Sequence, residues 1–223
     1  MSPNQSIPQG APVDADGIWA QVLRPFSGRG RRPALFLDRD GVVLVEIGYL
    51  HTARETELIP GAAAVIARAN ACAVPVVLVT NQSGIGRGYF GWEEFAAVQD
   101  RTIELLAAEG ASLDAVYACP HHPMATPPYD HADHPARKPN PGMLDRAAAA
   151  LEIDLSRSWI VGDHTGDLEA GRNAGLAGGL HVLTGHGTHA GQREGSLALN
   201  GDDYRVFPVE SVNDALTMVP LLG

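Results

Sequence analysis

Apolar and polar positions alternate in blocks of strand length and helix length from about residue 34 onward. Short β-branched runs such as Val76–Thr80 predict buried strands, and longer amphipathic segments predict helices. The predicted strands are Ala34–Asp38, Val76–Thr80, Ala115–Ala118, Trp159–Gly162, His181–Thr184 and, at an edge, Val206–Val209. The predicted helices are Ala62–Ala73, Trp92–Glu109, Gly142–Leu151, Asp167–Ala174 and Val212–Val219.

This alternation of strands and helices predicts an α/β fold, a doubly wound parallel sheet with helices on both faces. The intervals between the elements hold only loops and sheet-covering helices, so we expect no large cap domain. Three stretches are long and loop-like, at 41–59, 119–140 and 185–204. Ligands of such sheets bind beyond the carboxyl ends of the strands, so polar residues that directly follow a strand are the candidate site residues.

The N-terminal residues differ from the rest in composition. Residues 1–16 are rich in Pro, Gly, Ser and Gln and show no periodicity, which predicts a mobile tail. A short helix packed on the body is expected at Trp19–Phe26, followed by a basic, solvated linker at Gly28–Arg32. We therefore divide the chain into a flexible extension, residues 1–30, and one domain, residues 31–223.

Length and charge limit the function classes. A chain of 223 residues suits one α/β domain with a substantial core. The net charge of −10 argues against broad binding to nucleic acid or to an anionic membrane, although a local cluster of cations could still hold a small anion. No apolar run approaches the ~20 residues of a bilayer span, and the first residues lack the pattern of a secretion signal. The two cysteines, Cys72 and Cys119, are too few for a disulfide scaffold, so we expect a cytoplasmic location. We also expect a monomer.

Asp38 and Asp40 form the first candidate constellation. They follow the apolar strand Leu35–Leu37 and, being two residues apart, project toward the same side. Two such carboxylates repel each other unless a cation neutralises them, and their hard oxygens suit Mg²⁺. Taken alone, Asp-x-Asp-Gly is equally typical of a surface turn; the buried strand before it favours a site.

Two further segments supply groups that could hold phosphate. Thr80-Asn81-Gln82-Ser83-Gly84 ends a strand with hydroxyl, amide and backbone N–H donors. Arg137 and Lys138 directly precede a helix that starts at a proline, and they could clamp a phosphoryl group. An ordinary polar turn and a surface lysine remain the alternatives for these two segments.

Asp163 is the candidate for a third metal-site carboxylate. It ends the strand Trp159–Gly162, whereas Asp167 lies near the start of the next helix and could simply cap it. Together the four segments supply a nucleophile, an acid, a hydroxyl, a cation and a metal ligand on four strand ends. These are the groups that phosphoryl transfer needs, and their combination is more specific than any one segment.

The chain resembles the haloacid dehalogenase-like (HAD) superfamily of phosphohydrolases, whose four motifs it matches in order. Within that superfamily it is most similar to the D-glycero-D-manno-heptose 1,7-bisphosphate 7-phosphatases and the histidinol-phosphate phosphatases. The stretches that carry the resemblance are FLDRDGVV from Phe36, GYL from Gly48, LIPGA from Leu58, VTNQSGIGRGYF from Val79, CPHHP from Cys119, RKPNPGM from Arg137, GD at Gly162 and VLTGHG from Val182.

The resemblance implies an enzyme that hydrolyses a sugar phosphate through an aspartyl-phosphate on Asp38, with Asp40 as the general acid and base. It implies Mg²⁺ on Asp38, the Asp40 backbone carbonyl and Asp163, and phosphoryl oxygens held by Thr80 and Lys138. Contacts with the rest of a small phosphorylated sugar are expected from Arg39, Glu46, Tyr49, Asn81, Gln82, Ser83, Arg137 and His164. The family often has Lys at the position of His164, so this departure bears on substrate choice.

The resemblance also raises a structural Zn²⁺ in the 119–138 loop. Relatives bind it with Cys-x-His followed by Cys-x-Cys; here Cys119 and His121 match the first pair, and the later positions are His134 and Ala136. Ala136 cannot bind metal, so Asp133 or His131 would have to be the fourth ligand. A loop that has lost zinc is the alternative. The other histidines, among them His181 and His186, are expected to be surface or satisfied groups.

Three alternatives to this function remain open at the level of the sequence. Histidinol phosphate would be hydrolysed by the same chemistry. A phosphotransferase would pass the phosphoryl group to another alcohol instead of water. A phosphate-binding regulatory protein on the same scaffold is the non-enzyme alternative, although it would be expected to lack Asp38 or Asp40.

Overall fold

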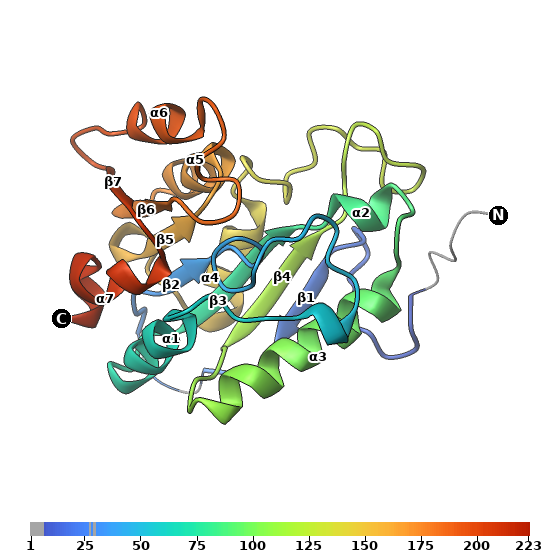
Figure 1. Ribbon diagram of the computed structural model, residues 1–223, viewed down its shortest axis with the longest axis horizontal. Helices are drawn as coiled ribbons and strands as arrows, with labels where there is room; N and C mark the ends of the chain where they lie inside the picture. Colours follow the sequence, from blue (N-terminus) through green and yellow to red (C-terminus); the bar gives the residue numbers. More distant parts are fainter. Residues whose placement is uncertain (1–6, 27, 29) are drawn as a thin grey trace.

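A mixed sheet of seven strands forms the centre of the computed structural model, which describes residues 7–26, 28 and 30–223 (Figure 1). The strands lie in the order β1-β4-β3-β2-β5-β6-β7. Their bounds are β1 (Trp19–Val22), β2 (Leu35–Leu37), β3 (Val76–Asn81), β4 (Ala115–Cys119), β5 (Trp159–Gly162), β6 (Gly178–Val182) and β7 (Arg205–Val209). β1 runs antiparallel to β4, and all other neighbouring strands are parallel.

Helices cover both faces of the sheet, as expected. They are α1 (Ala62–Ala71), α2 (Ser83–Gly86), α3 (Trp92–Ala108), α4 (Gly142–Leu151), α5 (Thr165–Asn173), α6 (Gln192–Leu197) and α7 (Ala215–Met218), with 3-10 turns at Ala53–Glu55, Leu155–Arg157, Val212–Asp214 and Pro220–Leu222. Helices α1, α3 and α7 pack on one face, and α4 and α5 on the other. Alternate strand residues serve the two cores: Leu35 and Leu37 face the first and Phe36 the second.

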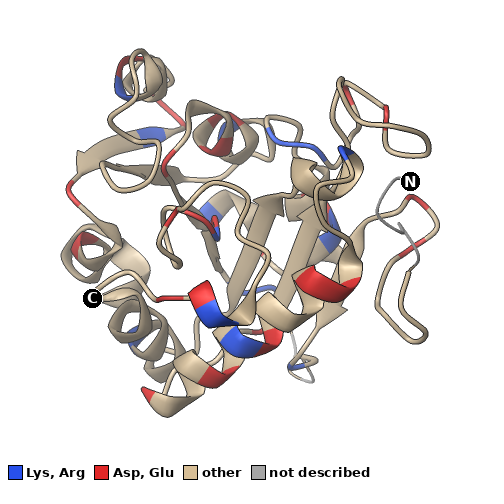
Figure 2. Cartoon of the chain, turned by 45° about the vertical axis from the view of Figure 1, so that its right-hand side comes forward, with Lys and Arg blue, Asp and Glu red and all other residues tan. Residues whose placement is uncertain are grey.

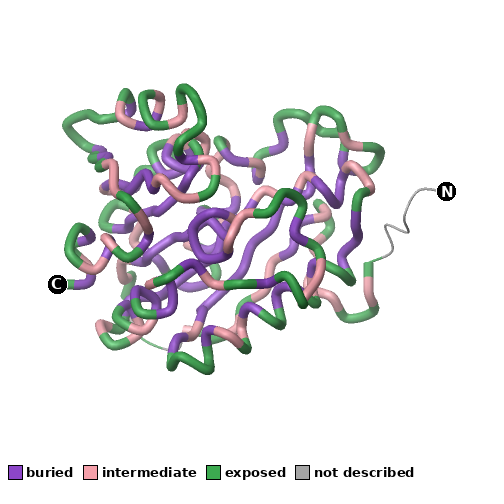
Figure 3. The backbone as a smooth tube through the Cα atoms, in the orientation of Figure 1, coloured by how far each residue is buried: buried purple, intermediate pink, exposed green. Residues whose placement is uncertain are grey.

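The fold class predicted from the sequence is therefore confirmed, and so is the absence of an inserted cap domain within the described residues. The central strands are buried except at Asn81, the last residue of β3 (Figure 3). Most predicted elements are present with ends shifted by one to three residues. The expected last helix is divided into a 3-10 turn and α7, and the loop expected at 185–204 contains α6.

The helix predicted over Trp19–Phe26 is wrong, because this segment contains strand β1. The unpaired edge of β4 accepts it, with Trp19 opposite Ala118 and Val22 opposite Ala115. Trp19 is buried and stacks on Trp92 of α3, with 5.7 Å between the ring centroids. The predicted boundary between a flexible extension and a domain at residue 30 therefore does not hold for β1, which belongs to the sheet. Residues 1–6, 27 and 29 lie outside the described residues.

The sheet topology creates one preferred place for a ligand. The chain leaves β2 toward β3 on one side and leaves β5 toward β6 on the other, so its connections diverge between the neighbouring strands β2 and β5. Open α/β sheets bind ligands in the crevice at such a point. Because Leu37 pairs with Val161, the residues that follow these strands, Asp38 and Asp163, emerge side by side there.

In the described part of the chain, no helix has both the length and the apolar character that crossing a bilayer requires.

Candidate active site

Three buried carboxylates converge at this crevice. Asp38, Asp163 and Asp167 each place an oxygen within 4.8 Å of the others. Glycines permit the close approach. A Cβ on Gly162 would lie 2.3 Å from the Cβ of Asp167, and one on Gly41, where φ is +85°, would lie 2.1 Å from Asp163 Oδ2. Side chains at either glycine would push these acids apart.

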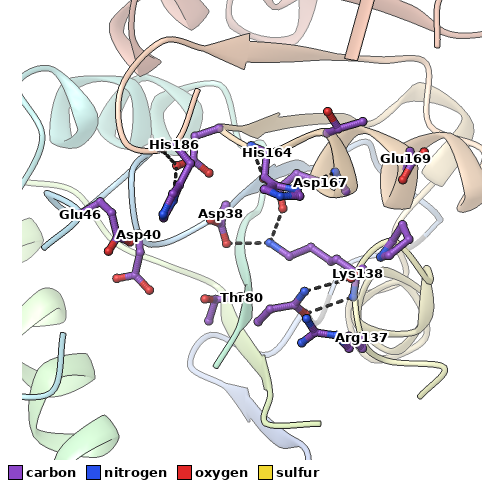
Figure 4. Close-up of a pocket in the computed structure, with 15 residues that line it drawn as sticks. Asp38, Asp40, Glu46, Thr80, Arg137, Lys138, His164, Asp167, Glu169 and His186 are labelled. Atoms are coloured by element: carbon purple, nitrogen blue, oxygen red, sulfur yellow. Dashed lines mark hydrogen bonds and ion pairs between the residues drawn. The ribbon is translucent and has the colours of Figure 1, made fainter. Parts of the chain in front are cut away.

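Lys138 lies among these acids and carries the charge that balances part of theirs (Figure 4). Its Nζ donates to Asp38 Oδ1 at 2.7 Å and to the backbone carbonyl of Val79 at 2.7 Å, and it pairs with Asp167 Oδ1 at 2.6 Å. Three acceptors occupy the three N–H bonds of one ammonium group. The lysine is therefore fixed and fully paired, although its side chain is buried.

The carboxylates remain underneutralised despite this lysine. Burial raises the pKa of Asp38, with Asp167 and Asp40 adding to the shift and Lys138 opposing it. Burial and the neighbouring charges of Asp38 and Asp167 likewise raise the pKa of Asp163. For Lys138, burial alone would lower the pKa, but Asp167 and Asp38 outweigh it and the net pKa is raised. One cation among three acids leaves negative charge that a further cation would stabilise.

The donor set fits Mg²⁺. Hard carboxylate oxygens on a rigid strand end are its preferred protein ligands. Asp167 has both oxygens engaged, Oδ1 with Lys138 and Oδ2 with the backbone N–H of His164 at 3.0 Å. Asp38 and Asp163 are thus the two acids that could hold the ion. Asp167 caps helix α5, as expected. It is also the partner of Lys138, which the sequence did not indicate.

Asp40 lies beside this group and is held from two sides. Arg39 donates to its two oxygens, from Nε at 3.1 Å and from Nη2 at 3.0 Å, and Gln82 Nε2 donates to Oδ2 at 2.9 Å. The same amide of Gln82 donates to Thr80 Oγ1 at 2.9 Å. Asp40 and Thr80 are therefore linked through one glutamine and cannot turn independently.

Arg39 corrects the expected substrate contacts, and Asn81 has a structural role besides lining the cavity. Arg39 is 1% exposed and lies against the ring of Phe95, so it holds Asp40 and does not face the cavity. Asn81 lines the cavity, but its amide also binds the backbone of Lys138, donating to the carbonyl at 3.0 Å and accepting from the N–H at 3.1 Å. Asn81 thereby fixes the loop segment that carries the lysine.

Two adjoining cavities open at this edge of the sheet. The larger, of about 440 Å³, is lined by Asp38, Asp40, Glu46, Thr80, Asn81, Arg137, Lys138, Asp163, His164, Asp167, Glu169 and His186 among others. The smaller, of about 310 Å³, shares Asp40, Glu46, Asn81 and His186 with it and adds Tyr49, Gln82 and Ser83. With the exception of Arg39, every residue expected to contact substrate lines one of the two.

Three lining residues with ionisable side chains were not among the sequence candidates for the site, namely His186, Glu169 and Asp167 in its role toward Lys138. The backbone N–H of His186 donates to Asp163 Oδ2 at 2.7 Å, and Thr184 Oγ1 donates to the carbonyl of Gly41 at 2.5 Å. The segment after β6 therefore packs on Asp163 and on Gly41, in the turn that follows Asp40. The sequence predicted only a loop at 185–204 and a surface or satisfied His186, so this contribution to the site was missed.

The expected zinc site is not assembled. Among the described residues, the three aspartates are the sole group of His, Cys, Asp or Glu compact enough for a metal ion. His121 and His134 stack face to face with 3.9 Å between ring centroids, and His134 Nδ1 accepts a hydrogen bond from the N–H of Ala136. Burial raises the pKa of the Cys119 thiol to about 11, which disfavours the thiolate that zinc requires. Ring stacking and hydrogen bonds hold this loop.

Comparison with known proteins agrees with this geometry. The pattern of the HAD-hydrolase-like family matches residues 135–207. A D-glycero-β-D-manno-heptose-1,7-bisphosphate 7-phosphatase of Mesorhizobium japonicum is 49% identical over 77% of this chain and 79% of its own. The crystal structure of a HAD-like phosphatase of Mesorhizobium loti superimposes with a TM-score of 0.83 at 42% identity, covering 96% of this chain and 98% of that one.

The D,D-heptose 1,7-bisphosphate phosphatase of B. bronchiseptica, crystallised with magnesium and phosphate, superimposes with a TM-score of 0.67 at 35% identity, over 81% of this chain and 94% of that one. The chain belongs to the HAD-like phosphatase family, and it is an enzyme of the phosphoric monoester hydrolase class.

Replacing Asp163 tests the metal site separately from catalysis. Asp163→Asn removes one charge next to the ion, and at an effective dielectric constant of about 20 a pair of unit charges 4 Å apart interacts by about 4 kcal/mol. We therefore expect Mg²⁺ to bind at least about tenfold more weakly, measured by titration calorimetry. The control is Asp100→Asn, because Asp100 is an exposed residue of α3, a helix that carries both acidic and basic side chains (Figure 2). Equal affinity in Asp163→Asn and the unsubstituted protein would contradict the assignment.

Proposed function

We propose that the protein is a Mg²⁺-dependent phosphatase that removes the 7-phosphate of D-glycero-D-manno-heptose 1,7-bisphosphate. The convergence of Asp38, Asp163 and Lys138 at the β2–β5 crevice is the observation that carries the chemistry. The names of the Mesorhizobium japonicum and B. bronchiseptica relatives support the choice of substrate.

Asp38 is the nucleophile in this proposal. Lys138 binds its Oδ1, so the carboxylate is oriented and one oxygen lone pair can attack phosphorus. The bond from phosphorus to the sugar oxygen breaks as the bond to Asp38 forms, and Asp40 gives its proton to the departing oxygen. Asp40 then takes a proton from water, which attacks the aspartyl-phosphate and releases inorganic phosphate.

The surrounding residues stabilise the transferring group. Thr80 and Lys138 line the larger cavity, and Lys138 would exchange one of its three present acceptors for a phosphoryl oxygen. Arg39 and Gln82 keep Asp40 aimed at the leaving group. Asp38, the Asp40 backbone carbonyl and Asp163 would hold Mg²⁺, which supplies positive charge to the phosphoryl oxygens.

The two cavities divide the remaining contacts by charge. Arg137 and His164 line the larger one, next to the reacting acids, and offer nitrogen donors to a second anionic group. Tyr49, Gln82 and Ser83 line the smaller one and offer neutral groups suited to sugar hydroxyls. Glu46 lies between the two and can accept hydrogen bonds from hydroxyls. A small sugar with a phosphate at each end would use both sets.

A phosphate-release screen with Mg²⁺ tests this function. We expect kcat/KM for the heptose 1,7-bisphosphate, tried as both anomers, to exceed that for histidinol phosphate, with turnover abolished by a chelator and restored by Mg²⁺. A preference for histidinol phosphate would overturn the substrate. A new phosphate ester in place of free phosphate would identify a phosphotransferase, and substrate binding with no turnover would identify a regulatory protein.

Replacing Asp40 tests the division of roles. Asp40→Asn keeps the shape of the side chain but cannot exchange a proton, so kcat should fall by roughly 10²–10⁴-fold, the usual contribution of general acid–base catalysis. Stopped-time assays on the substrate preferred in the screen give this value, with Asp100→Asn as the matched control. A kcat within a factor of two of the control would show that Asp40 does not transfer the proton.

A further inference from the structure

The loop at 119–141, which carries Arg137 and Lys138, begins at the last residue of β4 and has no further helix or strand among its described residues, yet its core is buried. His121 lies near the start of this loop and is 5% exposed. The backbone carbonyl of His121 accepts a hydrogen bond from Arg137 Nη1 at 2.8 Å. The position of the Arg137 guanidinium in the larger cavity therefore depends on where His121 is held.

The N-terminal segment holds His121. The ring nitrogen Nε2 lies 2.9 Å from the backbone carbonyl of Asp16, and because a carbonyl can only accept, Nε2 carries the proton. The opposite nitrogen, Nδ1, is buried with no hydrogen-bond partner, so this bond to Asp16 is the one polar anchor of the ring in the described structure. The other ring contacts are stacking on His134 and edge contacts with Tyr129 and His131.

The N-terminal segment is fixed to the body of the protein by Arg146, by Tyr129 and by strand β4. Asp14 and Asp16 both form ion pairs with Arg146 of α4. Asp14 Oδ1 accepts from the backbone N–H groups of Asp16 and Ile18, which closes the turn. Gly17, with φ of +74°, lies against Tyr129: a Cβ there would be 2.6 Å from the ring. β1 follows directly and pairs with β4, the strand that leads into the loop.

We propose that residues 14–17, defined here as the N-terminal clamp, position Arg137 for substrate binding by way of His121. This inference rests on the proposed function, because it takes Arg137 to contact the part of the substrate away from the reacting phosphate. The clamp touches neither substrate nor the reacting acids. It acts by fixing the loop, so its loss affects substrate binding and leaves the chemical step intact.

Arg146→Met tests the clamp because it removes both ion pairs and keeps the length of an unbranched, helix-forming side chain. The matched control is Arg101→Met, which breaks the exposed pair with Glu104 at 3.0 Å on the opposite face of the sheet. We expect Arg146→Met to raise KM for the heptose bisphosphate about twofold to fivefold, the range for partly exposed ion pairs, with kcat unchanged. Amide hydrogen exchange should become faster over residues 119–137, and the control should change neither quantity.

A second background separates positioning from a general loss of structure. In Arg137→Met the group being positioned is absent, so adding Arg146→Met should leave KM unchanged, whereas a structural effect would persist. Unchanged exchange and KM in Arg146→Met would overturn the proposal. Faster exchange with unchanged KM would also overturn it, since the loop would then be clamped without positioning Arg137. Failure of the proposed function is distinguishable, because it appears as absent turnover in the unsubstituted protein, and hydrogen exchange then decides whether the clamp exists.

Discussion

The buried ammonium of Lys138 is the interaction on which this site depends. It joins the acid that follows β2 to the acid at the start of α5, and it does so at the end of a loop about 100 residues further along the chain than Asp38. Removing one partner from such a buried pair leaves an uncompensated charge, which typically costs about 3–5 kcal/mol. The same lysine lowers the electrostatic cost of placing carboxylates together, although burial still keeps the pKa of Asp38 and of Asp163 raised.

The fold determines which elements supply the reacting acids and which supply the substrate contacts. The rigid, fully buried strands β2 and β5 fix the nucleophile and the metal-binding acid, because their parallel register leaves no freedom in how Asp38 and Asp163 emerge. Loops supply the groups that must suit a particular substrate. Arg137 comes from the 119–141 loop, and Glu46 and Tyr49 come from the loop after β2. Substrate choice can therefore vary in this fold without disturbing the reacting groups.

The sequence predicts the parts of this arrangement that depend on local pattern. Asp38 and Asp163 were found because each follows an apolar strand, a rule that needs no knowledge of tertiary contacts. Strand β1 was missed because four residues of mixed polarity become a strand only when β4 offers its edge. Arg39 was misassigned because only the folded structure shows it buried on Asp40. The zinc ligands were implied by the resemblance to relatives, but in this chain His121 and His134 stack on each other.

The central claim is that Asp38 itself carries the phosphoryl group during turnover. Rapid acid quenching of the enzyme with heptose bisphosphate labelled in the 7-phosphate, followed by peptide mapping, tests it most directly. We expect label in the peptide that contains Asp38, and the loss of this label in Asp38→Asn. Label on another residue, or turnover with no labelled peptide at any quench time, would contradict it.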